Sequence, residues 1–147
     1  MALLAIAAPA LLRAQGATPA SGCAPRASAS GPAFVIGNEA GNLRRSSAKF
    51  WTDGSVQLAG APRSAPDAAV ADSVASLARF ARRSTFWSSA APPITRPTRN
   101  PDMARHYIEA HLRCGAKRLL YPADAEPGDF HALFTRLTAL ARLASSR

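Results

Sequence analysis

A strand-like alternation in the second half of the chain constrains the fold more than any other feature. Between residues 103 and 112, apolar and polar side chains alternate, which is the period of a strand with one buried face. A tight turn at Cys114-Gly115 lets residues 116–121 return as an antiparallel partner. Such a hairpin predicts a sheet that is covered on one face only. The expected register sets Ala110 opposite Leu119 and Ile108 opposite Tyr121.

Three shorter strand-like runs come earlier, over residues 33–36, 43–51 and 56–59. Asp53-Gly54 separates the last two and indicates a two-residue type I′ turn, a turn that needs positive φ at both positions. We therefore expect a meander of three strands. In its register Trp51 lies opposite Val56 and Lys49 opposite Leu58, so Trp51, Val56 and Leu58 share the buried face.

Two segments have the period of amphipathic helices. The first runs to about Ser84, and we expect Ser64 to cap it together with Asp67, in a variant of the capping box. Phe86 and Trp87 follow and are expected to dock its end onto the sheet. The apolar stripes are Val70, Val74, Leu77 and Ala81 in the first helix and Phe130, Leu133, Phe134, Leu137, Leu140, Ala141 and Leu143 in the second.

The order of elements is therefore βββ-α-ββ-α. It predicts an α+β fold, a mostly antiparallel sheet with two helices packed on one face. A chain of 147 residues has room for one such domain, which we place at residues 33–144.

The first residues predict export. Residues 1–12 are apolar and span about 18 Å as a helix, too short for a bilayer core of about 30 Å but typical of a signal peptide. We expect cleavage after Ala14, which makes residues 1–14 a signal peptide and places the protein in the periplasm or outside the cell. Residues 15–32, rich in Gly, Ala, Ser and Pro, are expected to form a flexible linker. Lipidation at Cys23 is disfavoured because no large aliphatic residue stands three positions before it.

The two cysteines, Cys23 and Cys114, are candidates for a disulfide in an exported protein. Such a bridge would close a loop of about ninety residues and stabilise the fold by roughly 4 kcal/mol through loop-closure entropy. Two free thiols are the alternative.

The sequence holds no catalytic or metal-binding motif of the common kinds. His106 and His111 fall on opposite faces of one strand, so they cannot share an ion, and His131 is expected on a helix face. Asp124, Glu126 and Asp129 precede the last helix, where acidic groups suit the helix dipole. We therefore expect no enzyme activity, no metal and no cofactor.

The chain is basic, with 18 Lys and Arg against 9 Asp and Glu and a net charge of +9. In an exported protein such a surface meets anionic lipid or polysaccharide rather than nucleic acid, so a basic surface module is one interpretation. The other is a protein-binding domain. The best candidate surface for a partner is the outward face of the second hairpin, formed by Arg105, Tyr107, Glu109 and His111.

The chain also resembles emfourin-like proteins, small bacterial inhibitors of thermolysin-type metalloproteases, over about residues 34–143. The resemblance lies in the order of elements and their hydrophobic anchors. It implies an α+β fold and inhibition of a metalloprotease, but no inhibitory residue of that family can be matched here. The matching segments are Phe34–Ala59, the helix end from Leu77 to Phe86-Trp87, the hairpin Tyr107–Tyr121 and the closing stripe Phe130–Leu140.

Overall fold

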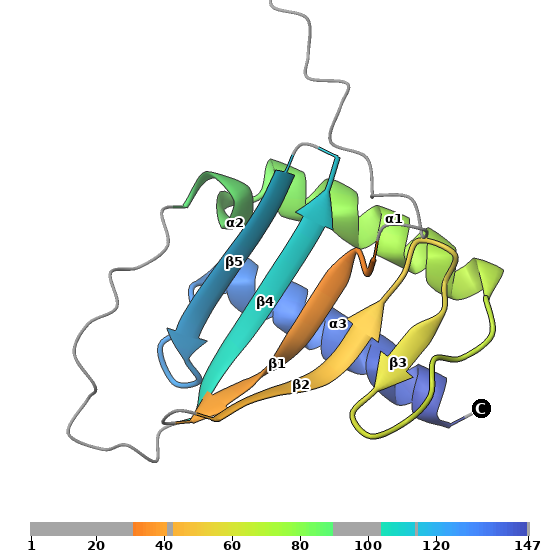
Figure 1. Ribbon diagram of the computed structural model, residues 1–147. Coiled ribbons are helices and arrows are strands. Elements are labelled where there is room, and N and C mark those ends of the chain that lie inside the picture. The colour runs from red at the N-terminus through yellow and green to blue at the C-terminus, as the bar shows by residue number, and fades with distance from the viewer. Residues whose placement is uncertain (1–30, 41–42, 90–103, 114, 147) are drawn as a thin grey trace, which may run out of the picture.

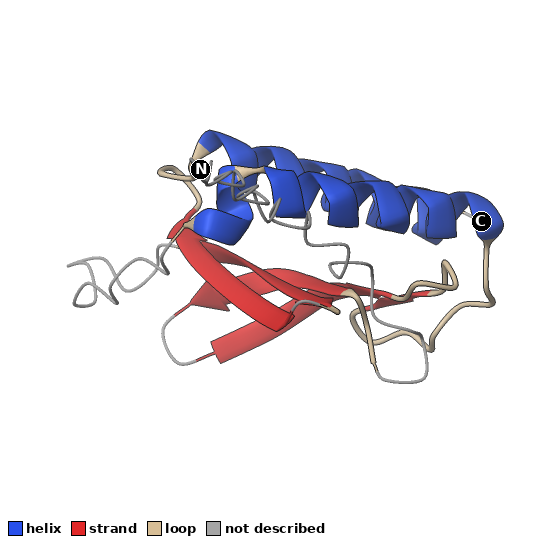
Figure 2. Cartoon of the chain, turned by 90° about the horizontal axis from the view of Figure 1, so that it is seen from above, coloured by secondary structure: helices blue, strands red, loops and turns tan. Residues whose placement is uncertain are grey.

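The computed structural model describes residues 31–40, 43–89, 104–113 and 115–146. They form one antiparallel sheet of five strands in the spatial order β3-β2-β1-β4-β5. All three helices lie on the same side of this sheet (Figures 1 and 2). The strands are β1 (Phe34–Ala40), β2 (Leu43–Phe50), β3 (Val56–Leu58), β4 (Arg105–Leu112) and β5 (Gly115–Pro122), and the helices are α1 (Ala68–Arg83), α2 (Thr85–Ser88) and α3 (Gly128–Ser145).

The α+β class and the helix-covered sheet are confirmed. The order of elements along the chain is also as predicted, except that the short helix α2 is added directly after α1. No helix within the described ranges is both long and apolar enough to cross a bilayer.

The core lies between the sheet and the helices. Alternate residues of the two central pairing strands enter it, such as Ile36 of β1 and Ile108 of β4. The predicted stripe of α1 is buried throughout, and Phe86 of α2 closes that end of the core, as expected. In α3 the buried stripe ends at Leu140, and Leu143 is 60% exposed. Leu143 was wrongly predicted to be buried. In the last turn of α3 Ala144, not Leu143, continues the stripe and packs against the core, so Leu143 points away from the sheet.

The hairpin between β2 and β3 corrects the predicted register by one residue. Phe50, not Trp51, pairs with Val56, and Trp51 pairs with Ser55 through a backbone hydrogen bond of 3.0 Å. The loop has three residues, and only its last one, Gly54, has positive φ. This is the geometry of a type I turn followed by a left-handed glycine. A shift of one residue exchanges the faces, so Phe50 enters the core while Trp51 lies outside it under the guanidinium of Arg63.

The hairpin between β4 and β5 is offset from its predicted register by two residues. Ala110 pairs with Lys117 and Ile108 pairs with Leu119, because the turn is tighter than expected and Leu112 already pairs with Gly115. An even shift leaves every side chain on its predicted face. The two faces of β4 were therefore predicted correctly even though its partners were not.

The start of α1 differs from the expected capping box. Asp67 is the N-cap, and its carboxylate accepts a hydrogen bond from the Val70 N–H at 3.0 Å. Ser64 instead accepts the Val56 N–H at 2.9 Å and so joins the loop before α1 to β3. Gly54 of the hairpin turn packs directly on this cap, since a Cβ there would lie 1.8 Å from the Asp67 carbonyl oxygen.

Several predictions fall on parts of the chain that the structure does not describe. The signal peptide at residues 1–14, residues 15–30 of the linker, and both Cys23 and Cys114 lie outside the described residues. Export and the disulfide therefore stay predictions.

Candidate functional site

The four predicted binding residues, Arg105, Tyr107, Glu109 and His111, share one side of β4. Ile108, Ala110 and Leu112 belong to the core under the helices, so their alternating neighbours lie on the opposite side of the sheet. Figure 2 shows that none of the described helices covers that side. We call it the open face, defined by the side chains Glu39, Arg105, Tyr107, Glu109, His111 and Arg118.

Ion pairs join the charged side chains of the open face. Arg118 of β5 lies in the middle, with its Nη2 3.2 Å from Glu39 Oε2 and its Nε 3.3 Å from Glu109 Oε1. His111 Nε2 lies 3.7 Å from the other oxygen of Glu109. One cation thus links strands β1, β4 and β5 across the face.

Tyr107 lies beneath this network and is only 1% exposed. It faces Gly37 of β1 in the sheet register, and a Cβ on that glycine would lie 2.7 Å from the tyrosine hydroxyl. The Arg118 guanidinium carbon lies 5.2 Å from the centre of the tyrosine ring, within the range of a cation–π contact. Tyr107 was predicted as a partner contact, and its ring is buried beneath Arg118.

Arg118 and Glu39 are the members of the open face that sequence reasoning missed. In the observed register Arg118 stands directly opposite Glu109, and opposite charges on facing strands attract each other. The predicted register placed Arg118 opposite His111 and so concealed this pair. The pairing of β1 with β4, which brings Glu39 to the face, was not predictable from local pattern.

A second polar cluster lies on the helix side of the sheet. The carboxylate of Glu126, whose side chain is 4% exposed, lies between two histidines, with Oε1 2.5 Å from His106 Nδ1 and Oε2 2.7 Å from His131 Nδ1. The His106 ring also stacks on Phe134 of α3, with centroids 4.3 Å apart. Glu126 was expected only to favour the helix dipole. Instead it joins β4 to α3, while Asp129 does lie in the first turn of that helix.

Among the described residues, the histidines lie in two separate places. His106 and His111 lie on opposite faces of β4, as predicted. Within the described ranges, no group of three or more His, Cys, Asp or Glu side chains could hold a metal ion. A carboxylate between two ring nitrogens accepts a hydrogen bond from each, so this cluster satisfies its own buried oxygen atoms.

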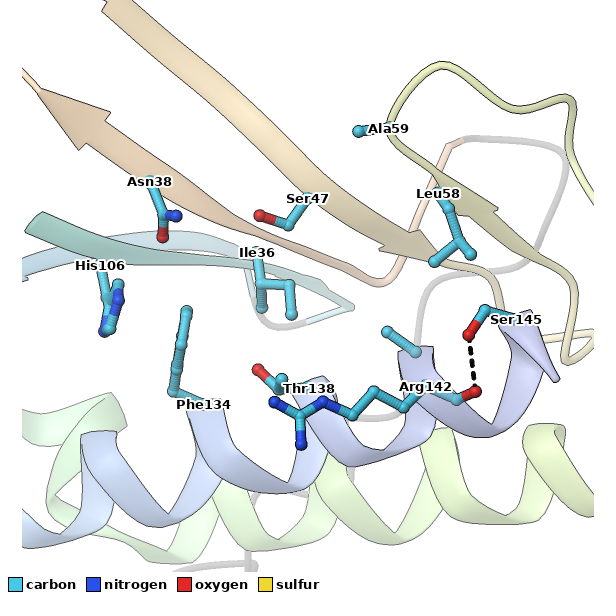
Figure 3. A pocket seen from close by; sticks show the side chains of 11 residues that line it. Ile36, Asn38, Ser47, Leu58, Ala59, His106, Phe134, Thr138, Arg142 and Ser145 are labelled. Atoms are coloured by element: carbon cyan, nitrogen blue, oxygen red, sulfur yellow. Dashed lines mark hydrogen bonds between the residues drawn. The ribbon is translucent and has the colours of Figure 1, made fainter. Parts of the chain in front are cut away.

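Next to His106, a groove opens between α3 and the strands β1, β2 and β3 (Figure 3). Its volume is about 590 Å³, which is within the range of about 300–1,000 Å³ for small-molecule sites. A bulge between Ile36 and Gly37 inserts Ser47 as an extra residue of β2, and this serine lines the groove. The walls are Ile36, Asn38, Ser47, Leu58 and Ala59 from the sheet side and Phe134, Thr138, Ala141, Arg142 and Ser145 from α3.

Comparison with known proteins identifies no relative for this arrangement. Neither a protein-family model, nor a curated protein, nor a solved structure matches the chain.

Proposed function

We propose that the protein is an exported, non-enzymatic binding protein whose open face docks on a protein partner. The observation that supports this most is the ion-pair network of Glu39, Glu109, His111 and Arg118, on a sheet face that none of the described helices covers. Side chains that are already fixed lose little conformational freedom when a partner arrives, which favours binding.

Arg118 is the anchor of this surface. Its side chain is 39% exposed, so it stays accessible while Glu39, Glu109 and the buried ring of Tyr107 hold its orientation. Arginine is among the side chains that contribute most to protein interfaces. A partner with an acidic or carbonyl-rich edge would suit this guanidinium.

The most specific form of the proposal is inhibition of a thermolysin-type metalloprotease, as the resemblance to emfourin-like proteins implies. The open face is one side of a sheet that no described helix covers, and such an exposed face suits a protein ligand. Inhibition by docking needs no catalytic residue on this chain.

Titration of a thermolysin-type protease with the purified full chain tests this form of the proposal. Peptide hydrolysis should fall as the protein approaches a one-to-one ratio with the enzyme. Inhibition should survive an increase from low to physiological salt, because an interface excludes ions from its centre. Undiminished hydrolysis by several such proteases at a ten-fold excess of the chain would contradict it, as would binding to anionic vesicles alone that disappears at physiological salt.

A further inference from the structure

The groove between α3 and the sheet lies on the opposite side of the sheet from the open face, so a partner on the open face leaves it accessible. Its walls differ in character. Ile36 and Leu58 on the sheet side and Ala141 on α3 form an aliphatic surface, and Phe134, stacked on His106, closes one end (Figure 3).

Thr138 carries a polar group that the fold leaves unused. Its Oγ1 is buried, and it has no hydrogen-bond partner among the residues that the structure describes. Figure 3 shows this oxygen directed from α3 toward the groove. A buried hydroxyl without a partner costs stability, so a ligand atom that accepts its hydrogen bond would be stabilised there.

Arg142 follows Thr138 by one turn of α3 and lines the same groove. Residues four apart lie on the same side of a helix, and Figure 3 shows the guanidinium beside Thr138. Arg142 forms no ion pair with any described residue, whereas Arg63 and Arg118 both do. A hydroxyl donor and a guanidinium that pairs with no described carboxylate, beside an aliphatic surface, make a site for a small anion with an apolar tail.

From these contacts we propose that the groove binds an aliphatic carboxylate, with the carboxylate on Thr138 and Arg142 and the alkyl chain along Ile36, Leu58 and Ala141. A guanidinium and a carboxylate match in geometry because two parallel N–H groups meet two oxygens. Asn38 and Ser47 on the opposite wall add polar groups at the edge of the groove. This site is independent of the proposed docking at the open face.

Titration calorimetry with the full chain tests this site, using sodium decanoate as the probe and decylamine as the ligand of equal length and opposite charge. Decanoate should bind at one saturable site at least ten-fold more tightly than decylamine. Arg142→Gln should weaken decanoate binding about 10- to 100-fold, the loss expected for a charge-assisted hydrogen bond, and Thr138→Val about 2- to 10-fold. Arg79→Gln is the matched control, since it removes an exposed arginine from α1, away from the groove, and should bind like the unchanged protein.

Three results would each overturn the assignment. They are no saturable decanoate binding below its micelle concentration, equal affinity for decanoate and decylamine, and an Arg142→Gln variant that binds decanoate as the Arg79→Gln variant does. Thr138→Val keeps the shape of the side chain and removes a hydroxyl that has no described partner. If the unfolding midpoint of this variant is not lowered, a loss of decanoate binding cannot be attributed to unfolding.

Discussion

The ring of Tyr107 on β4 lies across the backbone of Gly37 on β1, so closely that a Cβ on the glycine would be 2.7 Å from the tyrosine hydroxyl. The tyrosine is therefore 1% exposed on a sheet face that no described helix covers. The Arg118 guanidinium carbon lies 5.2 Å from the centre of the same ring, and this arginine pairs with two carboxylates. The shape of the open face thus depends on a residue that has no side chain.

Gly37→Ala should destabilise the fold by about 2 kcal/mol or more, as overpacking does in a filled site. The added methyl would also lie 2.1 Å from the Arg45 carbonyl oxygen, which is backbone and cannot rotate away. Urea unfolding measures the loss. Gly128→Ala at the start of α3 is the control, because no atom lies within 4 Å of its added Cβ, and we expect it to keep or slightly raise stability. Equal midpoints for the two variants would show that Tyr107 does not occupy this space.

Glu126→Gln should cost about 1–3 kcal/mol of unfolding free energy. A glutamine has one oxygen acceptor and one NH₂ donor, so one of His106 and His131 has to change its tautomer to keep its hydrogen bond, and the charge of the carboxylate is lost. Glu39→Gln on the open face removes a carboxylate from a more exposed ion pair and should cost less than about 1 kcal/mol. A Glu126→Gln loss no larger than that of Glu39→Gln, measured by urea unfolding, would mean that this cluster does not hold β4 to α3.

Stability should fall in acid partly through Asp129 and Asp53. The hydroxyl and the backbone N–H of Thr85, at 2.6 and 2.7 Å, hold the pKa of Asp129 below its usual value. Partial burial raises the pKa of Asp53, but hydrogen bonds from Ser55 and the nearby Arg63 outweigh it, and the net shift is downward. A lowered folded-state pKa gives stability that is present above the unfolded value of about 3.9 and is lost as pH falls through the folded value.

The Asp129→Asn variant tests this pH dependence. At neutral pH its urea midpoint should be lower than that of the unchanged protein. When the midpoints of the two proteins are plotted against pH, the two curves should converge below about pH 4. Asp124→Asn serves as the control, because that carboxylate is exposed and forms no hydrogen bond or ion pair with a described side chain, and its curve should stay parallel to that of the unchanged protein. An Asp129→Asn curve that also runs parallel at every pH would contradict the assigned role.

Thr138→Val should raise the unfolding free energy by about 1 kcal/mol, because it removes a buried hydroxyl that has no described partner. The change keeps a β-branched residue on α3, so helix propensity hardly alters. Ser73→Ala on α1 is a useful comparison, since the Ser73 hydroxyl donates to the Ala69 carbonyl and its loss offers no such gain. Lower stability for Thr138→Val would indicate that the hydroxyl has a partner in the folded protein.

Much of the fold could be predicted from short-range patterns. The alternation along β4 determined which side chains face the helices, and it stayed correct when the register moved by two residues. The stripe from Phe130 to Leu140 identified the buried side of α3 for the same reason, since each face is fixed by the local period alone.

The errors arose where a turn determines the outcome. Asp53-Gly54 is compatible with both a two-residue and a three-residue loop, and the choice between them decided whether Phe50 or Trp51 entered the core. Prediction of the cluster of His106, Glu126 and His131 also required a contact between segments that are far apart in the sequence. The return of β5 places Ala123 beside Ala104, joined by a backbone hydrogen bond, and so brings the loop before α3 back to the start of β4.

The central claim, docking of a protein partner through the open face, is tested most directly by inhibition of a thermolysin-type protease with two arginine variants. Arg118→Ala should raise the inhibition constant at least ten-fold, because it removes the anchor of the surface. The variant should still fold, since an exposed ion-pair network contributes only about 1 kcal/mol or less to the free energy of unfolding. Arg79→Ala, on α1 and so on the helix side of the sheet, should inhibit like the unchanged protein. Equal inhibition by the two variants, or loss of inhibition in Arg79→Ala alone, would contradict the claim.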